Sequence, residues 1–233
     1  MTTLATRRFD SRAALDQALE ERLAAAIAAP GAAAPAIMLS GGTTPLPAYR
    51  ALGTRSLARN DQLHILFSDE RYVPADSPAS NYLQSQPLLQ ALALPQSAVL
   101  RVRTELTLEE AADDYERRLA ALLAAGVVIR PGLLGLGAEG HTASLFCAAD
   151  LERARGRLAI PVLRPDGMSA VSVTPAFLAR VSEPLFVVAG SGKREAVRAL
   201  LAQDPQLTAW RAVQGCASVE LWMDLAAEQP PLG

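Results

Sequence analysis

The stretch LLGLGAEGHTASLF, residues 133–146, joins an apolar run to a polar segment through a glycine-rich turn. The apolar residues 132–137 predict a buried strand, and GHTASLF, residues 140–146, is expected to begin the helix that follows. A strand that leads through a turn into a helix is the repeating unit of α/β proteins with a parallel sheet.

The same order recurs along the chain. Short apolar runs at 35–40, 63–68 and 184–190 precede polar or glycine-containing turns, and helical patterns follow at 46–52 and 191–202. The runs are continuously apolar, which indicates strands covered on both faces. The sequence therefore predicts an α/β fold with a doubly wound, mostly parallel sheet and helices on both faces. No repeat, low-complexity linker or change of composition divides it, so residues 1–233 are expected to form a single domain.

Other segments carry local signals of helices, strands and loops. Ser11 follows Asp10 and can cap a helix that Pro30 ends, and Thr107 with Glu110 forms a capping box for a helix over 107–125. Further helices are expected at 80–92, disturbed by a proline, and at 174–180. Strands are expected at 157–163, 169–174 and the start of 217–227. Residues 69–82 are expected to form a loop.

Composition narrows the possible partners and compartments. Charged residues make up 20 % of the chain and the formal net charge is -2, so no basic excess points to nucleic acid or to an anionic membrane. No segment is apolar and long enough to span a membrane, and the first ten residues lack the apolar core of a signal peptide. Cys147 and Cys216 have no metal-ligand spacing and are expected to be free, mostly buried thiols. A cytoplasmic protein without metal or cofactor is expected.

The first candidate anion site is the turn after the run at 35–40. Its glycines allow a close approach of the backbone to an anion, and the following helix start directs unpaired N–H groups toward it. Three hydroxyl groups add further donors. The candidate residues of this turn are Ser40, Gly41, Gly42, Thr43 and Thr44. An ordinary capped turn would have the same pattern.

Two cations stand at the ends of other predicted strands. Arg71 follows Asp69 and Glu70 and offers a planar fork for a phosphate or carboxylate, although a surface ion pair is the alternative. Lys193 is the only lysine among 22 basic residues and begins the helix after the run at 184–190. A compact ammonium at that position suits a terminal phosphate. Carboxyl ends of parallel strands share one edge of a sheet, so these groups are expected to converge.

His141 is the candidate catalytic residue. In the first turn of a helix its imidazole would stay neutral, and a neutral imidazole can accept a proton from water. Glu139 could orient the ring, Gly140 permits a sharp turn, and backbone N–H groups of residues 137–140 could stabilise an oxyanion. The alternative for His141 is a capping or packing role. The other histidine, His64, lies inside an apolar run and is expected to be a core or sheet residue.

Four motifs together identify a family resemblance. SGGTTP, FSDERYVP with the later SNY, LLGLGAEGHTASLF and VVAGSGKREAV, in this order, resemble the 6-phosphogluconolactonase family over nearly the whole chain. The resemblance implies a Rossmann-like fold of the NagB type and hydrolysis of 6-phospho-D-glucono-1,5-lactone to 6-phospho-D-gluconate, the second step of the oxidative pentose phosphate pathway. It implies a small sugar-phosphate lactone as the partner, no nucleic acid, membrane or cofactor, and a monomer or a dimer.

The resemblance also assigns roles to residues. His141 matches the family's general base, the phosphate-binding role falls on residues 40–42, Arg71 and Lys193, and the SNY motif adds Asn81 to the candidate substrate-binding residues. Asp69 and Glu70 are expected to hold Arg71 or to bind sugar hydroxyls. The chain departs from the family pattern at Glu139, where an aspartate is usual. It departs again at Ala170, where an arginine is usual. Any substrate contact of that arginine is either absent here or supplied by another residue, for which Arg164 is a candidate.

Two other functions share parts of this pattern. Isomerases or deaminases of the glucosamine-6-phosphate type resemble it in the Asp-Glu pair and the Gly-His dipeptide, but they are expected to have a carboxylate soon after the histidine. HTASLFCA has none before Asp150. A sugar-phosphate sensor would need a DNA-binding segment, and no helix-turn-helix pattern precedes residue 35.

Overall fold

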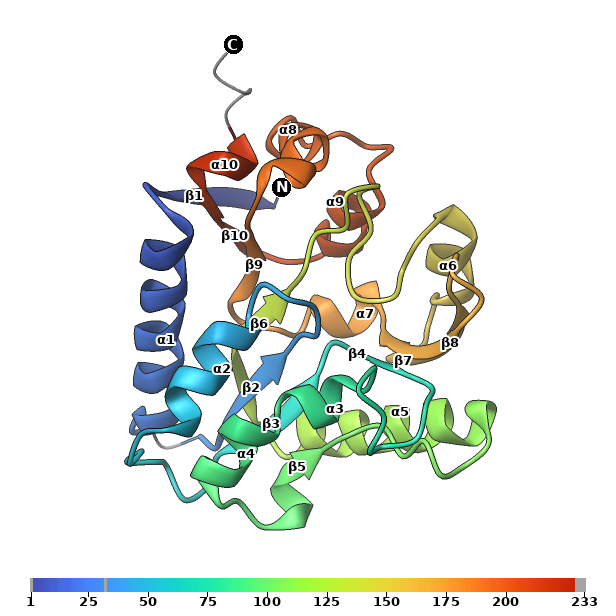
Figure 1. Ribbon diagram of the computed structural model, residues 1–233. Coiled ribbons are helices and arrows are strands. Elements are labelled where there is room, and N and C mark those ends of the chain that lie inside the picture. The colour runs from blue at the N-terminus through green and yellow to red at the C-terminus, as the bar shows by residue number, and fades with distance from the viewer. Residues whose placement is uncertain (1, 32, 229–233) are drawn as a thin grey trace.

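The main sheet of the computed structural model, which describes residues 2–31 and 33–228, has seven strands. Every neighbouring pair in it runs parallel. In spatial order the strands are β1 (Thr3–Phe9), β10 (Ser218–Asp224), β9 (Pro184–Val188), β6 (Val128–Leu134), β2 (Pro35–Leu39), β3 (His64–Phe67) and β5 (Val99–Leu100). The predicted doubly wound, parallel sheet is confirmed (Figure 1).

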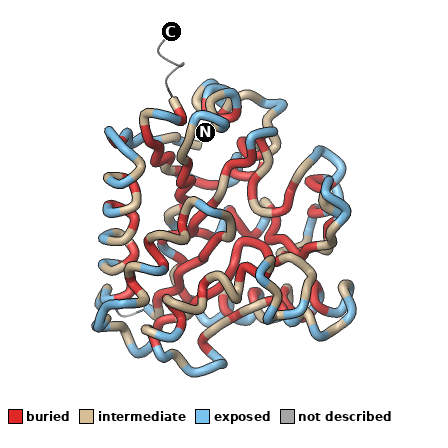
Figure 2. Tube along the Cα trace, in the orientation of Figure 1, coloured by how far each residue is buried: buried red, intermediate tan, exposed pale blue. Residues whose placement is uncertain are grey.

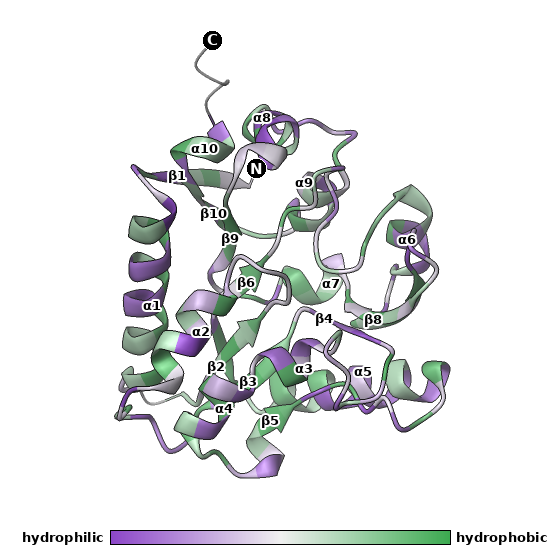
Figure 3. Ribbon diagram, viewed as in Figure 1, coloured by the Kyte–Doolittle hydropathy of each residue, from purple (hydrophilic) through white to green (hydrophobic). Residues whose placement is uncertain are grey.

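Helices cover both faces of this sheet. On β2, the side chains of Ile37 and Leu39 belong to one buried cluster, and those of Ala36 and Met38 belong to another on the opposite face. The first cluster includes residues of α1 (Arg12–Ala28), α2 (Leu46–Gly53) and α4 (Gln86–Leu92). The second includes residues of α5 (Leu108–Ala124), α7 (Pro175–Leu178), α8 (Arg194–Leu201) and α9 (Thr208–Val213). Burial is therefore densest along the central strands, which are also the most hydrophobic part of the molecule (Figures 2 and 3).

Two predicted helix starts are present with their side-chain caps. The Ala14 N–H donates to the Ser11 hydroxyl at the start of α1. The Glu110 N–H donates to the Thr107 hydroxyl, and the Thr107 N–H donates to the Glu110 carboxylate, which completes the capping box of α5. Short polar side chains at these positions satisfy N–H groups that a helix leaves without a partner.

A second, three-stranded antiparallel sheet was not predicted. It consists of β4 (Asp69–Arg71), β8 (Ser169–Val173) and β7 (Ala159–Leu163). The prediction that residues 69–82 form a loop is therefore wrong for 69–71. The helix expected over 80–92 is confirmed, as the two short helices α3 (Asn81–Gln84) and α4. The partner of β4 comes about a hundred residues later in the chain, so no local pattern could reveal the pairing.

Several short elements were also missed, among them β1, β5, α6 (Ala148–Arg153) and α9. The helix expected over 140–146 is absent, and that segment forms turns and an isolated bridge. The remaining short helices are η1 (Gln96–Ala98), η2 (Ser191–Lys193) and α10 (Leu225–Glu228).

The direction of the chain through the sheet reverses between β2 and β6. From β2 the chain proceeds outward to β3 and β5, and from β6 it proceeds the other way to β9 and β10. In open parallel sheets, ligands bind outside the carboxyl ends of strands at such a reversal. The turns after β2 and β6 are therefore the place to look for a site.

Within the described residues, no helix is long and apolar enough to cross a membrane. Both cysteines are free, as expected, but only Cys216 is buried and Cys147 is exposed. Burial raises the pKa of the Cys216 thiol to about 11.

Candidate active site

A cavity of about 370 Å³ lies where β2, β3, β6 and β9 end. Most of the predicted site residues line it, namely Ser40, Gly41, Gly42, Thr43, Thr44, Asp69, Arg71, Asn81, His141 and Lys193. They come from five segments that are far apart in the sequence. Three predicted residues, Glu70, Glu139 and Gly140, are not part of its wall.

The 40–44 turn is fixed by contacts with two helices. The buried Tyr49 hydroxyl of α2 donates to the Ser40 carbonyl and accepts from the Ser40 N–H. The Arg12 guanidinium, at the start of α1, donates to the carbonyls of Thr43 and Thr44. Because these carbonyls are held by a cation, the turn is preorganised for a ligand that approaches its N–H groups and hydroxyls.

Gly41 and Asn81 lie in close contact across the cavity wall. A Cβ atom at position 41 would be 2.0 Å from Asn81 Oδ1, so only glycine fits there. The Asn81 amide donates to the Asp69 carbonyl. Asn81 Oδ1 and Arg71 Nε are buried without a hydrogen-bond partner among the described residues. Two unpaired polar groups in the wall of one cavity are the groups that a hydroxylated anionic ligand would satisfy.

Glu70 is not part of the described wall of this cavity, and of its two expected roles, holding Arg71 or binding sugar hydroxyls, its contacts support the first. Its buried carboxylate accepts the backbone N–H groups of Arg71, Asn81 and Tyr82 at 2.7–2.9 Å. Burial raises the pKa of Glu70 to about 7, and the three N–H groups oppose that shift. Glu70 therefore fastens α3 to β4 and sets the position of Asn81 and Arg71.

Lys193 reaches the cavity from η2, directly after β9. The turn before it contains Gly190 with φ 91°, a conformation that glycine adopts easily. The Gly190 N–H donates to the buried carboxylate of Asp224, which also accepts the Ala227 N–H. Asp224, at the end of β10, thus holds the lysine-bearing turn, and the sequence analysis missed it. A single aspartate at the end of an apolar strand was the available signal.

Residues 135–147 form a compact loop and not the start of a helix. Gly140 has φ 89° and Ala143 has φ 49°, which no α-helix contains. The Gly137 N–H donates to the His141 carbonyl, and the Gly140 N–H donates to the Gly137 carbonyl. Thr142 adds a hydroxyl bond to the Gly135 carbonyl. The loop satisfies its backbone locally, and this also corrects the expectation that the N–H groups of Gly137 and Gly140 are free for an oxyanion.

His141 is therefore neutral for a different reason from the one expected. Burial lowers the pKa of the imidazole, and the Arg164 charge acts in the same direction. Glu139 opposes the shift, because its carboxylate lies 2.8 Å from His141 Nδ1. With Nδ1–H donating to Glu139, Nε2 is the acceptor nitrogen of the ring. The ring also packs on Phe146, with centroids 4.3 Å apart.

Glu139 stays ionised beside this ring. Burial raises its pKa, but its own backbone N–H and the nearby His141 and Lys193 outweigh that effect, so the pKa of Glu139 lies below its usual value. The Glu139 side chain is 59 % exposed. It therefore contacts His141 from the solvent side.

Gly137 leaves room for the imidazole. A Cβ atom at position 137 would lie 2.0 Å from His141 Nδ1 and 2.9 Å from Glu139 Oε2. Gly135, two residues earlier, would place a Cβ atom in open space. The two glycines of this turn are thus not equivalent, and only Gly137 is required by the His141 side chain.

Asp69 is the only carboxylate in the described wall of the cavity. Its oxygens accept the hydroxyls of Ser68 and Ser144 at 2.8 and 2.7 Å. These two hydroxyl groups fix the buried carboxylate in the cavity wall. Asp69 is placed to accept a hydroxyl group of a ligand.

Arg164, the candidate for the contact of the arginine absent at Ala170, also lines the cavity. Its guanidinium lies 5.2 Å from the Phe146 ring centroid, and Asp166 holds it at 2.9 Å. His141 contacts the same phenyl ring. Together with Arg71 and Lys193, Arg164 gives the wall three cations against one carboxylate, so the cavity attracts anions.

No cluster of three or more metal-ligating side chains occurs in the described part of the chain. The cavity wall offers a neutral imidazole with an oriented proton, hydroxyl and amide donors, and cations.

Comparisons with known proteins identify the family of this chain. The model of the family described as glucosamine-6-phosphate isomerases/6-phosphogluconolactonase matches residues 8–222. Among curated relatives, the 6-phosphogluconolactonase of Nostoc sp. is 36 % identical over 71 % of this chain and 71 % of its own. The human 6-phosphogluconolactonase is 36 % identical over 81 % of this chain and 76 % of its own.

Solved structures have the same fold. The crystal structure of 6-phosphogluconolactonase from Thermotoga maritima superposes with a TM-score of 0.79 at 26 % identity, covering 95 % of this chain and 100 % of that one. A monomeric glucosamine-6-phosphate deaminase superposes with a TM-score of 0.78 at 18 % identity over 96 % and 98 % of the two chains, which is a likeness of fold. This chain belongs to the glucosamine-6-phosphate isomerase/6-phosphogluconolactonase family.

Proposed function

We propose that this protein hydrolyses 6-phospho-D-glucono-1,5-lactone to 6-phospho-D-gluconate with a water molecule activated by His141. The observation that carries the proposal is the state of that histidine. Burial keeps the imidazole neutral, Glu139 holds the proton on Nδ1, and the ring stands in the wall of a cation-rich cavity. A neutral imidazole with a defined acceptor nitrogen is what a general base requires.

The phosphate of the substrate binds the 40–44 turn, Lys193 and Arg71. These groups supply hydroxyls, backbone N–H groups and two cations around one end of the cavity. Asn81 Oδ1 and Asp69 accept sugar hydroxyls, and Arg71 Nε donates to the ligand, which satisfies the two atoms left without partners. Binding at the phosphate end fixes the lactone carbonyl about 3 Å from the water, a distance suited to attack.

Hydrolysis proceeds in two proton-coupled steps. His141 Nε2 takes a proton from water as the water oxygen bonds to the lactone carbon, and the carbonyl oxygen becomes an oxyanion. The bond from that carbon to the ring oxygen then breaks, and the ring oxygen takes the proton from His141. The new carboxylic acid releases its own proton to solvent.

Arg164 is the group that stabilises the oxyanion in this mechanism. The N–H groups of Gly137 and Gly140 are occupied within the loop, whereas the Arg164 guanidinium lines the cavity and packs on the same phenyl ring as His141. A cation aimed at developing negative charge lowers the barrier to its formation.

Deamination or isomerisation of a glucosamine phosphate is the rival activity within this family. It was expected to need a carboxylate soon after the histidine, and the first one is Asp150. That carboxylate accepts the N–H groups of Phe146 and Cys147, pairs with Arg153, and is buried outside the cavity wall. Asp150 therefore serves as a helix cap, which favours the lactonase.

The decisive experiment uses freshly prepared 6-phosphogluconolactone and subtracts its spontaneous opening. His141→Ala is expected to lower kcat about 100- to 10,000-fold, the range that a general base contributes, with an unchanged circular dichroism spectrum. Ammonia release from glucosamine 6-phosphate, measured in parallel with the unaltered protein, is expected to stay at background. Near-normal turnover by the variant would remove His141 from the mechanism, and ammonia release would reverse the choice between the two activities.

A further inference from the structure

A second cavity, larger than the candidate active site, lies at the edge of the sheet. Its volume is about 640 Å³, within the range of pockets that hold small organic ligands. It is bounded by the edge strand β5, by the first residue of β3 and by one face of α5. The amino end of β3 forms part of its wall, so it is separate from the site at the carboxyl ends.

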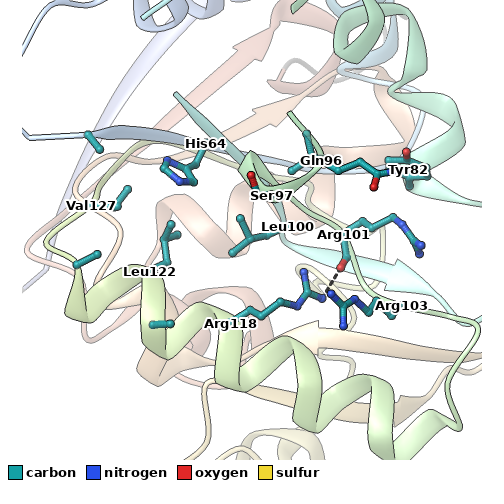
Figure 4. A pocket seen from close by; sticks show the side chains of 14 residues that line it. His64, Tyr82, Gln96, Ser97, Leu100, Arg101, Arg103, Arg118, Leu122 and Val127 are labelled. Atoms are coloured by element: carbon teal, nitrogen blue, oxygen red, sulfur yellow. Dashed lines mark hydrogen bonds between the residues drawn. The ribbon is translucent and has the colours of Figure 1, made fainter. Parts of the chain in front are cut away.

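The two ends of this cavity differ in chemistry (Figure 4). Leu122 and Val127 lie at one end with the His64 ring, and Leu100 lies between the ends. Arg101, Arg103 and Arg118 gather at the other end. No carboxylate belongs to the described wall. Such an arrangement fits a ligand with one apolar, flat end and one anionic end.

The arginine end has more positive charge than its own carboxylates neutralise. Asp114 alone is the partner of three guanidinium groups, those of Arg103, Arg117 and Arg118 at 3.3, 3.6 and 2.8 Å. Arg101 is separately paired with Glu105. The Arg103 side chain is half exposed and has only the long contact to Asp114, so it retains N–H donors for a ligand.

Polar groups at the other parts of the wall have free hydrogen-bonding capacity. His64 Nδ1 is 2.8 Å from the Gln62 carbonyl, which leaves Nε2 as an acceptor. The side chains of Gln96 and Ser97 also line the cavity and bring a carboxamide and a hydroxyl group to its wall. Acceptors and donors beside apolar side chains match the ring nitrogens and amino groups of a heteroaromatic base.

From this arrangement we infer that the second cavity is a nucleotide-binding site, with the base between His64 and Leu122 and the phosphates on Arg103 and Arg118. The inference is independent of the lactonase proposal, because none of these residues lines the catalytic cavity. The chemistry recognised is a flat heterocycle joined to two or more phosphate charges.

The first test is calorimetric titration of the full-length protein with adenosine, AMP, ADP and inorganic phosphate. ADP is expected to bind more tightly than AMP, and both more tightly than adenosine or phosphate alone, since the two ends contribute together. Raising the salt concentration should weaken ADP binding. Absence of ADP binding at millimolar concentration would overturn the inference, as would tighter binding of decanoate, which has an anionic head but no base.

Matched variants locate the site. Arg103→Met is expected to weaken ADP binding about tenfold or more, by removal of charge-assisted hydrogen bonds. Arg117→Met removes the same charge and a contact to the same Asp114, but Arg117 does not line the cavity, so ADP binding should persist. Equal losses in the two variants would mean that only the general positive charge matters, and would contradict the site.

A second pair tests the apolar end. Ala121→Phe, in the cavity wall on α5, is expected to fill that end and weaken ADP and adenosine binding, whereas Ala120→Phe, outside this wall, should leave both unchanged. Lactone turnover and the melting temperature should be the same in all four variants. Displacement of ADP by 6-phosphogluconate would place the nucleotide in the catalytic cavity and overturn the assignment.

Discussion

His141 shows how a residue's surroundings, and not its position on an element, set its protonation. The sequence suggested a helix start as the reason for a neutral imidazole, but the helix is absent and burial has the same effect. Glu139 acts in the opposite direction and raises the pKa of the ring. Burial therefore sets the charge of the histidine, and the contact with Glu139 determines that Nε2 is the free nitrogen.

The pH profile of the reaction tests this balance. A base whose pKa lies below 6.5 remains active into mildly acidic solution, and activity declines as the pH falls through that lowered pKa. Glu139→Gln removes the group that raises it, so the acidic limb of kcat should move to still lower pH. The variant also weakens the hydrogen bond that holds the proton on Nδ1, and at about 1 kcal/mol for such a bond kcat at pH 7.5 should fall about fivefold. An acidic limb that moves to higher pH would refute the role assigned to Glu139.

The two glycines of the turn after β6 provide a sharper comparison. Gly137→Ala would force the His141 ring and the Glu139 carboxylate to move, and a displacement of about 1 Å at a catalytic group costs about 100-fold in rate. Gly135→Ala meets no other protein atom within 4 Å and leaves the His141 ring in place; because Gly135 lines the cavity, the two variants are compared by kcat and not by KM. The measurement is the kcat of lactone hydrolysis for the two variants. Equal activities would mean that the loop can adjust, contrary to the geometry.

At the level of elements, local signals predicted what local interactions build. The caps at Ser11 and Thr107 lie within three residues of the N–H groups they bind, and both helices begin where expected. The strand ends that surround the cavity were found because apolar runs and glycine turns are adjacent in the chain. These signals located most of the wall of the site before any geometry was known.

What the sequence could not predict depends on distant contacts. β1 is recognisable only by its parallel pairing with β10, and β4 only by its pairing with β8. The loop at 135–147 replaces a helix because Gly140 and Ala143 have positive φ, which interrupts a helical path, while cross-loop hydrogen bonds satisfy the backbone. The sequence left open whether Glu70 holds Arg71 or binds a ligand. Its three N–H partners come from Arg71 and from α3, and the sequence does not show that α3 packs against Glu70.

The turn after β9 places Lys193 in the cavity wall, and the contribution of this element can be tested. Lys193→Ala should raise KM about tenfold or more by loss of a charge-assisted contact to phosphate, with a smaller effect on kcat. Arg198→Ala, on the exposed side of α8, removes an equal charge outside the cavity and should not change KM. Steady-state kinetics on both variants distinguish them. An unchanged KM for Lys193→Ala would make the single lysine incidental.

For the whole molecule, the buried Glu70 couples stability to pH. Its pKa is about 7 in the folded protein and 4.5 without burial, so the folded state binds more protons between these values and stability is lost as the pH rises through them. This difference in pKa corresponds to a loss of about 3 kcal/mol in the free energy of unfolding. His141, with a lowered pKa, contributes the opposite slope.

A comparison with Glu70→Gln isolates this contribution. Urea unfolding at pH 5, 6, 7 and 8 should give a free energy of unfolding that declines more with pH in the unaltered protein than in the variant. The slope of the difference, and not either curve alone, is the quantity to measure, because His141 is common to both. Parallel curves would show that Glu70 does not take up a proton in this range.

The placement of Lys193 has a practical consequence. Because the 233 residues contain no other ε-amine, an acylating reagent directed at lysine has one side-chain target, and this target stands in the wall of the catalytic cavity. A bound sugar phosphate would shield this amine, so the rate of its acylation would report on filling of the phosphate end. The label itself would remove the charge and close that end to phosphate.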